Sequence, residues 1–291
     1  MNVPMNTLDP LTQDLAADDW AGEMGQRWLA GLDRFESMIS PVGGALLDRA
    51  EFAAGERVID IGCGGGATTR DIACGVGPAG EVLGLDISPA LIAEARRRAV
   101  ADGLEAVRFE VGDAATCLPD GAPFDHLFSR FGTMFFGDPE AAFRNFGRLV
   151  RKGGRLDIAV WAPAKGNPWV AGLMGILRNH IDIPPPPPGA PGPFSLDDPE
   201  RVRRLLEGGG FGEIDVYFWQ GRQLLGGAGS DAESATQFMF DSMSWGKLLA
   251  QQSESVQAMV RAEVRELFRS HETPSGVMMG ANAWLVQARH V

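Results

Sequence analysis

Basic residues are scarce in this 291-residue chain, which carries 26 lysines and arginines against 38 aspartates and glutamates. The resulting net charge of −12 argues against a nucleic-acid partner, because binding to DNA or RNA needs a basic face. The run Arg96-Arg97-Arg98 is a local exception. We predict that it is a solvated face of a helix rather than a track for phosphates.

Cysteine and long apolar runs are also in short supply. Cys63, Cys74 and Cys117 lack the spacing of a metal site and leave one thiol without a disulfide partner. We expect reduced thiols and no metal. The acidic N-terminal stretch has no basic and apolar segments of a secretory signal, so we expect a cytoplasmic protein. No run is long and apolar enough to predict a membrane span.

The most informative segment is residues 57–66, Arg-Val-Ile-Asp-Ile-Gly-Cys-Gly-Gly-Gly. An apolar strand leads into glycines, and a helical pattern follows from Ala67. Glycine lets the backbone turn sharply and approach a ligand, so this arrangement predicts a nucleotide at the carboxyl edge of a parallel sheet. Gly62, Gly64 and Ala67 also have the spacing of dinucleotide folds. Asp60, however, precedes the loop, and a carboxylate there would repel a pyrophosphate.

Two more acids follow predicted strands. Asp86 ends a strand at 81–85 and lies 24 residues after Gly62. An acid that binds ribose hydroxyls is expected about 20 residues beyond the glycine loop. Asp113 follows a strand at 107–111. Since parallel strands end at one edge of a sheet, we expect Asp60, Asp86 and Asp113 to gather there. A ligand with cationic groups and ribose hydroxyls suits such a site.

Residues 60–66 resemble motif I of the class I S-adenosylmethionine (SAM)-dependent methyltransferases, and the turn 151–154, Arg-Lys-Gly-Gly, is similar to a later region of that family. The pattern is most similar to bacterial members related to the ubiquinone/menaquinone C-methyltransferase group. The resemblance implies SAM as cofactor, S-adenosylhomocysteine (SAH) as product, and in-line transfer of a methyl group to a small, largely apolar or aromatic acceptor. It implies cofactor contacts from Asp60, Gly62, Cys63, Gly64, Thr68, Asp86, Ile87, Gly112, Asp113, Ala114, Ser129 and Arg130.

Strands and helices alternate five times over residues 57–161, which predicts a doubly wound α/β sheet. Ser88-Pro89 and Asp138-Pro139 are predicted to cap and begin two of these helices. The resemblance implies a seven-stranded, mostly parallel, Rossmann-like sheet. Its antiparallel last strand, expected within 277–288, would lie beside a strand at 213–225. Further helices are expected at 199–207, 231–250 and 255–270.

Four segments follow from this reading. They are N-terminal helices that cover the cofactor (1–50), the SAM-binding core (51–162), a proline-rich insertion (163–196), and a segment that completes the sheet and carries a helical insertion at about 231–270 (197–291). The prolines at 184–188 cannot lie inside a helix or sheet, and either a stiff lid or a plain spacer accounts for them.

Aromatic and methionine side chains in several segments predict an apolar acceptor pocket, since such side chains make adaptable surfaces. The candidates are Trp20, Trp28, Phe131, Met134, Phe135, Trp161, Trp169, Phe238 and Met239. Any one of them could equally be plain core.

No general base stands out among the four histidines. His126 lies within a predicted strand and is expected to be a packing residue. The catalytic candidates are His180, as a base, and Arg130, which could bind an acidic acceptor or the cofactor carboxylate. A nucleophilic acceptor needs no strong base. Two alternatives remain, an NAD-dependent oxidoreductase and a non-catalytic SAM-binding module. The acceptor, the methylated atom and the oligomeric state stay open.

Overall fold

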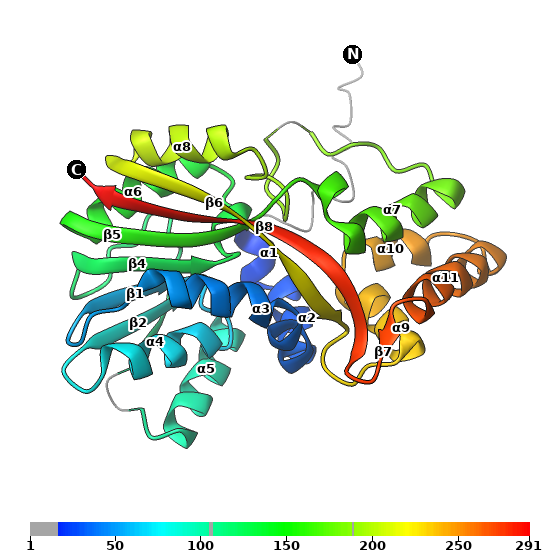
Figure 1. Cartoon of the computed structure of the whole chain (residues 1–291), viewed down its shortest axis with the longest axis horizontal. Helices are drawn as coiled ribbons and strands as arrows, with labels where there is room; N and C mark the ends of the chain where they lie inside the picture. Colours follow the sequence, from blue (N-terminus) through cyan, green and yellow to red (C-terminus); the bar gives the residue numbers. More distant parts are fainter. Residues whose placement is uncertain (1–16, 105–106, 188) are drawn as a thin grey trace, which may run out of the picture.

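The computed structural model describes residues 17–104, 107–187 and 189–291. Its centre is a mixed sheet with the strand order β3-β2-β1-β4-β5-β8-β6 (Figure 1). The strands are β1 (Arg57–Ile61), β2 (Glu81–Asp86), β3 (Val107–Val111), β4 (Phe124–Arg130), β5 (Val150–Trp161), β6 (Phe211–Leu225) and β8 (Gly276–His290). The two-residue strand β7 (Glu272–Thr273) pairs with β8 outside this order. The predicted α/β sheet is confirmed, with β7 as an addition.

The first five strands of the chain are parallel, and β8 runs antiparallel between β5 and β6. A strand with neighbours on both sides and helices on both faces is buried along most of its length, which explains the apolar run near the C-terminus. β6 and β8 are both long and extend beyond the rest of the sheet (Figure 1). The expected antiparallel last strand is therefore present.

Helices cover both faces of the sheet (Figure 1). One face carries α3 (Leu32–Ala50), α4 (Ala67–Val76) and α5 (Pro89–Ala101), and the other carries α6 (Pro139–Leu149) and α8 (Pro199–Gly208). Two of these helices begin where the sequence predicts. Ser88 accepts a hydrogen bond from the backbone of Leu91, and Asp138 accepts one from Ala141, with proline at the first helical position in each case.

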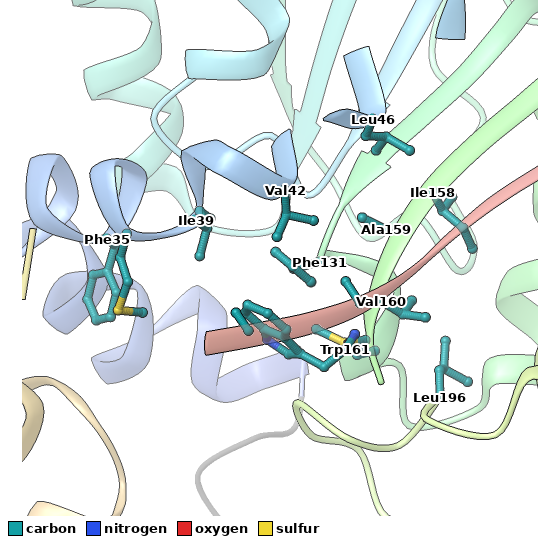
Figure 2. Packing of buried hydrophobic residues seen from close by; sticks show 14 of the residues in the cluster. Phe35, Ile39, Val42, Leu46, Phe131, Ile158, Ala159, Val160, Trp161 and Leu196 are labelled. Atoms are coloured by element: carbon teal, nitrogen blue, oxygen red, sulfur yellow. The ribbon is translucent and has the colours of Figure 1, made fainter. Parts of the chain in front are cut away.

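The helix α3 joins the N-terminal segment to the sheet. Phe35, Ile39, Val42 and Leu46 recur at helical spacing and are all buried, and Figure 2 shows the Val42 and Leu46 end of this row beside Ala159 of β5. Two shorter helices, α1 (Ala17–Ala21) and α2 (Glu23–Ala30), precede it. Packing of this apolar stripe holds the N-terminal helices against the core.

Four helices pack together beyond the end of the sheet, beside the extensions of β6 and β8 (Figure 1). They are α7 (Pro168–His180), α9 (Ala232–Ser242), α10 (Trp245–Ala250) and α11 (Glu254–Arg269). The sequence predicts a single helix over 231–250, and this prediction is wrong: α9 ends at Ser242 and α10 begins at Trp245. A Cβ at Gly246 would lie 1.7 Å from the Phe240 carbonyl oxygen, so only glycine permits this close turn.

The helix α7 lies inside the proline-rich segment, where the sequence analysis expected none. Asn167 and Pro168 stand at its start, a pattern typical of a helix N-terminus. Two short 3₁₀ turns, η1 (Thr133–Phe135) and η2 (Ala164–Gly166), complete the connections after β4 and β5. None of the helices in the described part of the chain is long and apolar enough to cross a bilayer.

Candidate cofactor and acceptor site

The glycine loop after β1 turns with positive φ angles at Gly62 (66°), Gly64 (56°) and Gly66 (77°). A Cβ at Gly62 would lie 2.9 Å from the Cα of Gly132, the residue that begins the turn after β4. The backbone of the glycine loop therefore contacts the backbone of the turn after β4, which leaves no room for a side chain at position 62. At Gly64 the nearest atom to an added Cβ is Trp28 Nε1 at 3.9 Å, so the front of the loop is open. The loop forms the floor of a cavity.

Asp86 is the acid that holds this loop in place. Its two carboxylate oxygens each accept a backbone N–H at 2.9 Å, from Gly64 and from Ser88. Burial raises the pKa of Asp86, and the two N–H groups oppose that rise. Asp86 lines the cavity, and so does Asp113, which accepts a bond from the Ala115 N–H. The two acids therefore follow neighbouring strands and share one edge of the sheet.

Asp60 lies behind the loop and not at its mouth. It is 1% exposed and does not line the cavity; one oxygen accepts bonds from the hydroxyls of Thr68 (2.8 Å) and Thr69 (2.7 Å). Burial raises its pKa to about 6, against the lowering effect of these hydrogen bonds and of Arg130. Ser129 is likewise buried, and its hydroxyl donates to the Ile61 carbonyl. Asp60, Thr68 and Ser129 thus sit where they support the loop, out of reach of a ligand in the cavity.

Predicted residues of both groups meet in a single cavity at the carboxyl edge of the sheet. The predicted cofactor contacts that line it are Gly62, Cys63, Gly64, Asp86, Ile87, Gly112, Asp113, Ala114 and Arg130. The predicted acceptor residues that line it are Trp20, Trp28, Phe131, Met134, Phe135, Trp161 and Trp169. Elements far apart in sequence therefore build one enclosure with a polar and an apolar part.

The apolar part is a continuous wall of aromatic rings. Phe131 stacks on Trp161 with ring centroids 4.1 Å apart, Trp161 contacts Trp169 at 5.6 Å, and Trp169 contacts Trp245 at 6.3 Å. Phe131 has a φ of 64°, a conformation that non-glycine residues rarely adopt. Such strain persists only where packing fixes it, and it is often found at ligand sites. A further aromatic contact of the lining joins Trp20 and Phe135, whose ring centroids are 5.0 Å apart.

Comparison with known proteins assigns the chain to a family. Residues 52–165 match the model described as "Methyltransferase domain". A stretch of 175 residues is 35% identical to demethylmenaquinone methyltransferase of Thermus thermophilus and covers 59% of this chain and 67% of that protein. The chain belongs to the SAM-dependent methyltransferases.

Other relatives of this methyltransferase share shorter stretches. Aklanonic acid methyltransferase of a Streptomyces species is 38% identical over 40% of this chain, and nocamycin O-methyltransferase of Saccharothrix syringae is 31% identical over 47%. The chain spans about half the length of these two relatives, 53% and 49%. The solved YcgJ protein of Bacillus subtilis shares the fold, with a TM-score of 0.55 and 20% identity over 86% of this chain and 98% of that one.

The residues of the cavity fit SAM. Asp86 and Asp113 offer carboxylate oxygens to the hydroxyl and amino donors of a ligand. The open side of the glycine loop at Gly64 leaves room for the ligand to lie against it. Arg130, at the end of β4, also lines the cavity. Burial lowers the pKa of Arg130, while the carboxylates of Asp60, Glu36 and Asp71 counteract this. A pyrophosphate fits less well, because the carboxylates of Asp86 and Asp113 line the same cavity and would repel its negative charge.

Besides Asp60, Thr68 and Ser129, three further predicted site residues lie outside the cavity lining. His180 Nε2 lies 2.9 Å from the Glu263 carboxylate, which ties α7 to α11 outside the cavity lining. Phe238 packs on Phe35 at 4.8 Å between ring centroids, and Met239 is fully buried, so both are core residues of α9. Through Phe238, α9 packs against α3.

Three residues of the lining that come from α3 were not predicted: Glu36, Met38 and Ile39. Met243, between α9 and α10, and Trp245, the first residue of α10, also line the cavity. These two belong to the same Met- and aromatic-rich insertion as the predicted Phe238 and were candidates for the acceptor wall with it. Of the proline-rich segment, Pro193 and Phe194 line the cavity. Glu36 carries no local signal, since an acid on a helix face is ordinary in any sequence. Among the described residues, no cluster of His, Cys, Asp and Glu could hold a metal ion.

Proposed function

We propose that this methyltransferase transfers the methyl group of SAM to a small, largely apolar or aromatic acceptor and releases SAH. The observation that carries the proposal is the division of one cavity into two parts. Acids and the glycine loop form one part, and the wall from Phe131 to Trp245 forms the other. A cofactor in the first part and an acceptor in the second would meet within the enclosure.

The cofactor would be held by residues that the sequence analysis named. We place Asp86 and Asp113 at its hydroxyl and amino donors, the loop from Gly62 to Gly64 beneath it, and Arg130 at its carboxylate. SAM would supply a methyl group on its sulfonium sulfur; the acceptor nucleophile would bond to the methyl carbon as the carbon–sulfur bond breaks, and SAH would leave with the electron pair of that bond. The protein's own part is to align the two reactants and to exclude water from between them.

The acceptor would be bound mainly by aromatic side chains, with few charged groups around it. Apart from Arg130, the described residues that line the cavity include no histidine, lysine or second arginine. With His180 outside the lining, we propose that the chain uses no histidine base and that the acceptor brings its own nucleophile, such as an acidic hydroxyl, a carboxylate or an enolate. Several curated relatives are named as methyltransferases of an acid or as O-methyltransferases, which supports this proposal.

The segments of the chain have separate roles in this proposal. The N-terminal helices would cover the cofactor, since Trp28 and Glu36 line the cavity, and the C-terminal helical insertion would shape the acceptor side through Met243 and Trp245. The tip of the N-terminal segment, residues 1–16, lies outside the described part of the chain. All three cysteines are free thiols, which supports a cytoplasmic location.

The first experiment is calorimetric titration of the full chain with SAH, and with NADH in parallel. We expect micromolar binding of SAH and none of NADH; the reverse result would contradict the proposal. The second experiment incubates the protein with methyl-labelled SAM and a panel of aromatic phenols, enols and acids. Transfer of label is expected. SAH binding without transfer to any acceptor of the panel would favour a non-catalytic SAM-binding module instead.

A further inference from the structure

An acid from the N-terminal helices reaches the glycine loop. Glu36, on α3, lines the cavity with a side chain that is 16% exposed. A Cβ built on Gly65 would lie 2.9 Å from Glu36 Oε1, which places this oxygen directly against the loop. Asp60, the acid that motif I supplies, lies buried behind the same loop. Glu36 therefore presents a carboxylate to the cavity at a point where motif I presents none.

Arg98, a half-buried arginine of α5, holds Glu36 in this position. Arg98 Nη1 donates to Glu36 Oε2 at 2.8 Å, and the same guanidinium pairs with Asp33 and Glu94, each at 2.7 Å. The side chain of Arg98 is only 15% exposed, whereas Arg97 is 67% exposed, so the predicted solvated face holds for Arg97 and not for Arg98. With Oε2 bound to Arg98, Oε1 is the oxygen that faces the loop.

Glu36 also has a cationic neighbour in the cavity. Arg130 lines the same cavity and is attracted electrostatically to Glu36. The strand order places Arg130, at the end of β4, on the other side of β1 from Asp86 and Asp113, which follow β2 and β3. Besides Asp86 and Asp113, the cavity is therefore lined by one further carboxylate, Glu36, and by the guanidinium of Arg130. A pair of opposite charges is complementary to a zwitterionic α-amino carboxylate.

We infer that Glu36 binds the α-ammonium group of the cofactor's amino-acid end, with Arg130 at the adjacent carboxylate and Arg98 as the residue that positions Glu36. This inference rests on the proposed function, because it takes SAM to be the ligand. It also gives the N-terminal helices a specific role. They complete the cofactor site, because α3 carries Glu36, and the ion pair with Arg98 of α5 keeps the Glu36 carboxylate at the glycine loop.

The test compares two ligands that differ only in the ammonium group. SAH and its analogue with hydrogen in place of the α-amino group are titrated by calorimetry into the wild type, Glu36→Gln and Asp33→Asn. A charged hydrogen bond in a partly buried site corresponds to about a 10- to 100-fold change in affinity. We expect the wild type to prefer SAH by such a factor, and Glu36→Gln to lose that preference while its affinity for the analogue is unchanged.

Asp33→Asn is the matched control, since Asp33 also pairs with Arg98 but is 89% exposed and does not line this cavity. It should keep the wild-type preference. Arg98→Met should reduce the preference while Glu36 is still present, which would separate positioning from loss of the carboxylate. Circular dichroism confirms folding, and Arg98→Met serves as the test if Glu36→Gln does not fold.

Two results would overturn the inference. One is a wild type that binds SAH and the analogue equally well. The other is a folded Glu36→Gln variant that keeps the full preference for SAH. A wild type that binds neither ligand would overturn the proposed function itself, so the two failures are distinguishable.

Discussion

The buried carboxyl of Asp60 makes the stability of this methyltransferase depend on pH in an unusual direction. Burial raises the pKa of Asp60 from 3.8 to about 6, although Thr69, Thr68 and Arg130 act against the rise. A group with a raised folded-state pKa stabilises the fold fully below its unfolded value, and this contribution is lost as pH rises through the folded value. Asp60 should therefore destabilise the fold progressively between about pH 4 and pH 7.

The perturbation is Asp60→Asn, which removes the titration and keeps an oxygen that can accept bonds from Thr68 and Thr69. A pKa raised from 3.8 to about 6 corresponds, at about 1.4 kcal/mol for each pH unit, to about 3 kcal/mol. We expect the free energy of unfolding of the variant, relative to the wild type, to rise by about this amount from pH 4 to pH 7. Effects of the amide that do not depend on pH cancel in this comparison.

The assay is urea unfolding of the ligand-free chain at several pH values, followed by circular dichroism. Asp231→Asn is a control of opposite sign, because the backbone N–H of Ser234 lowers the pKa of Asp231. Its stability relative to the wild type should fall as pH rises through the acidic range. A difference between Asp60→Asn and the wild type that stays flat from pH 4 to pH 7 would refute the reasoning about Asp60.

Two further predictions concern the loop and a buried ion pair. Gly62→Ala should lower the affinity for SAH at least 10-fold, since its Cβ would lie 2.9 Å from Gly132 and its φ is 66°; calorimetry with an exposed-glycine control, Gly137→Ala, checks this, and unchanged affinity would count against the tight loop. Burial acts to lower the pKa of His126, but the carboxylates of Asp157 and Glu56 raise it overall. His126 should therefore stabilise the fold fully below pH 6.5 and lose this effect as pH rises above that value. The substitution His126→Gln should accordingly lower the free energy of unfolding more at pH 6 than at pH 8.5. An equal cost at both pH values would contradict this assignment.

Local patterns in the chain predict most of the fold. Strand, glycine and helix follow one another over residues 57–76 as the sequence indicates, and Ser88 and Asp138 cap their helices as expected. These features depend on backbone dihedral preferences and on hydrogen bonds between near neighbours, which the sequence encodes directly. The break after Ser242 and the helix α7 were missed, because the apolar periodicity does not record the close approach of Gly246 to the Phe240 carbonyl, and the prolines near α7 mask the helix that starts at Asn167-Pro168.

The site divides in the same way. Local patterns are enough to place Gly62, Gly64, Asp86 and Asp113 at the ends of successive strands, and parallel pairing brings them to one edge of the sheet. Which side of the glycine loop each carboxylate takes depends on packing between distant segments. Asp60 turns away from the cavity and under the loop, and Glu36 arrives from a helix that lies more than twenty residues earlier in the chain. The physical reason is that long-range packing of helices on the sheet places these carboxylates, and no local pattern records it.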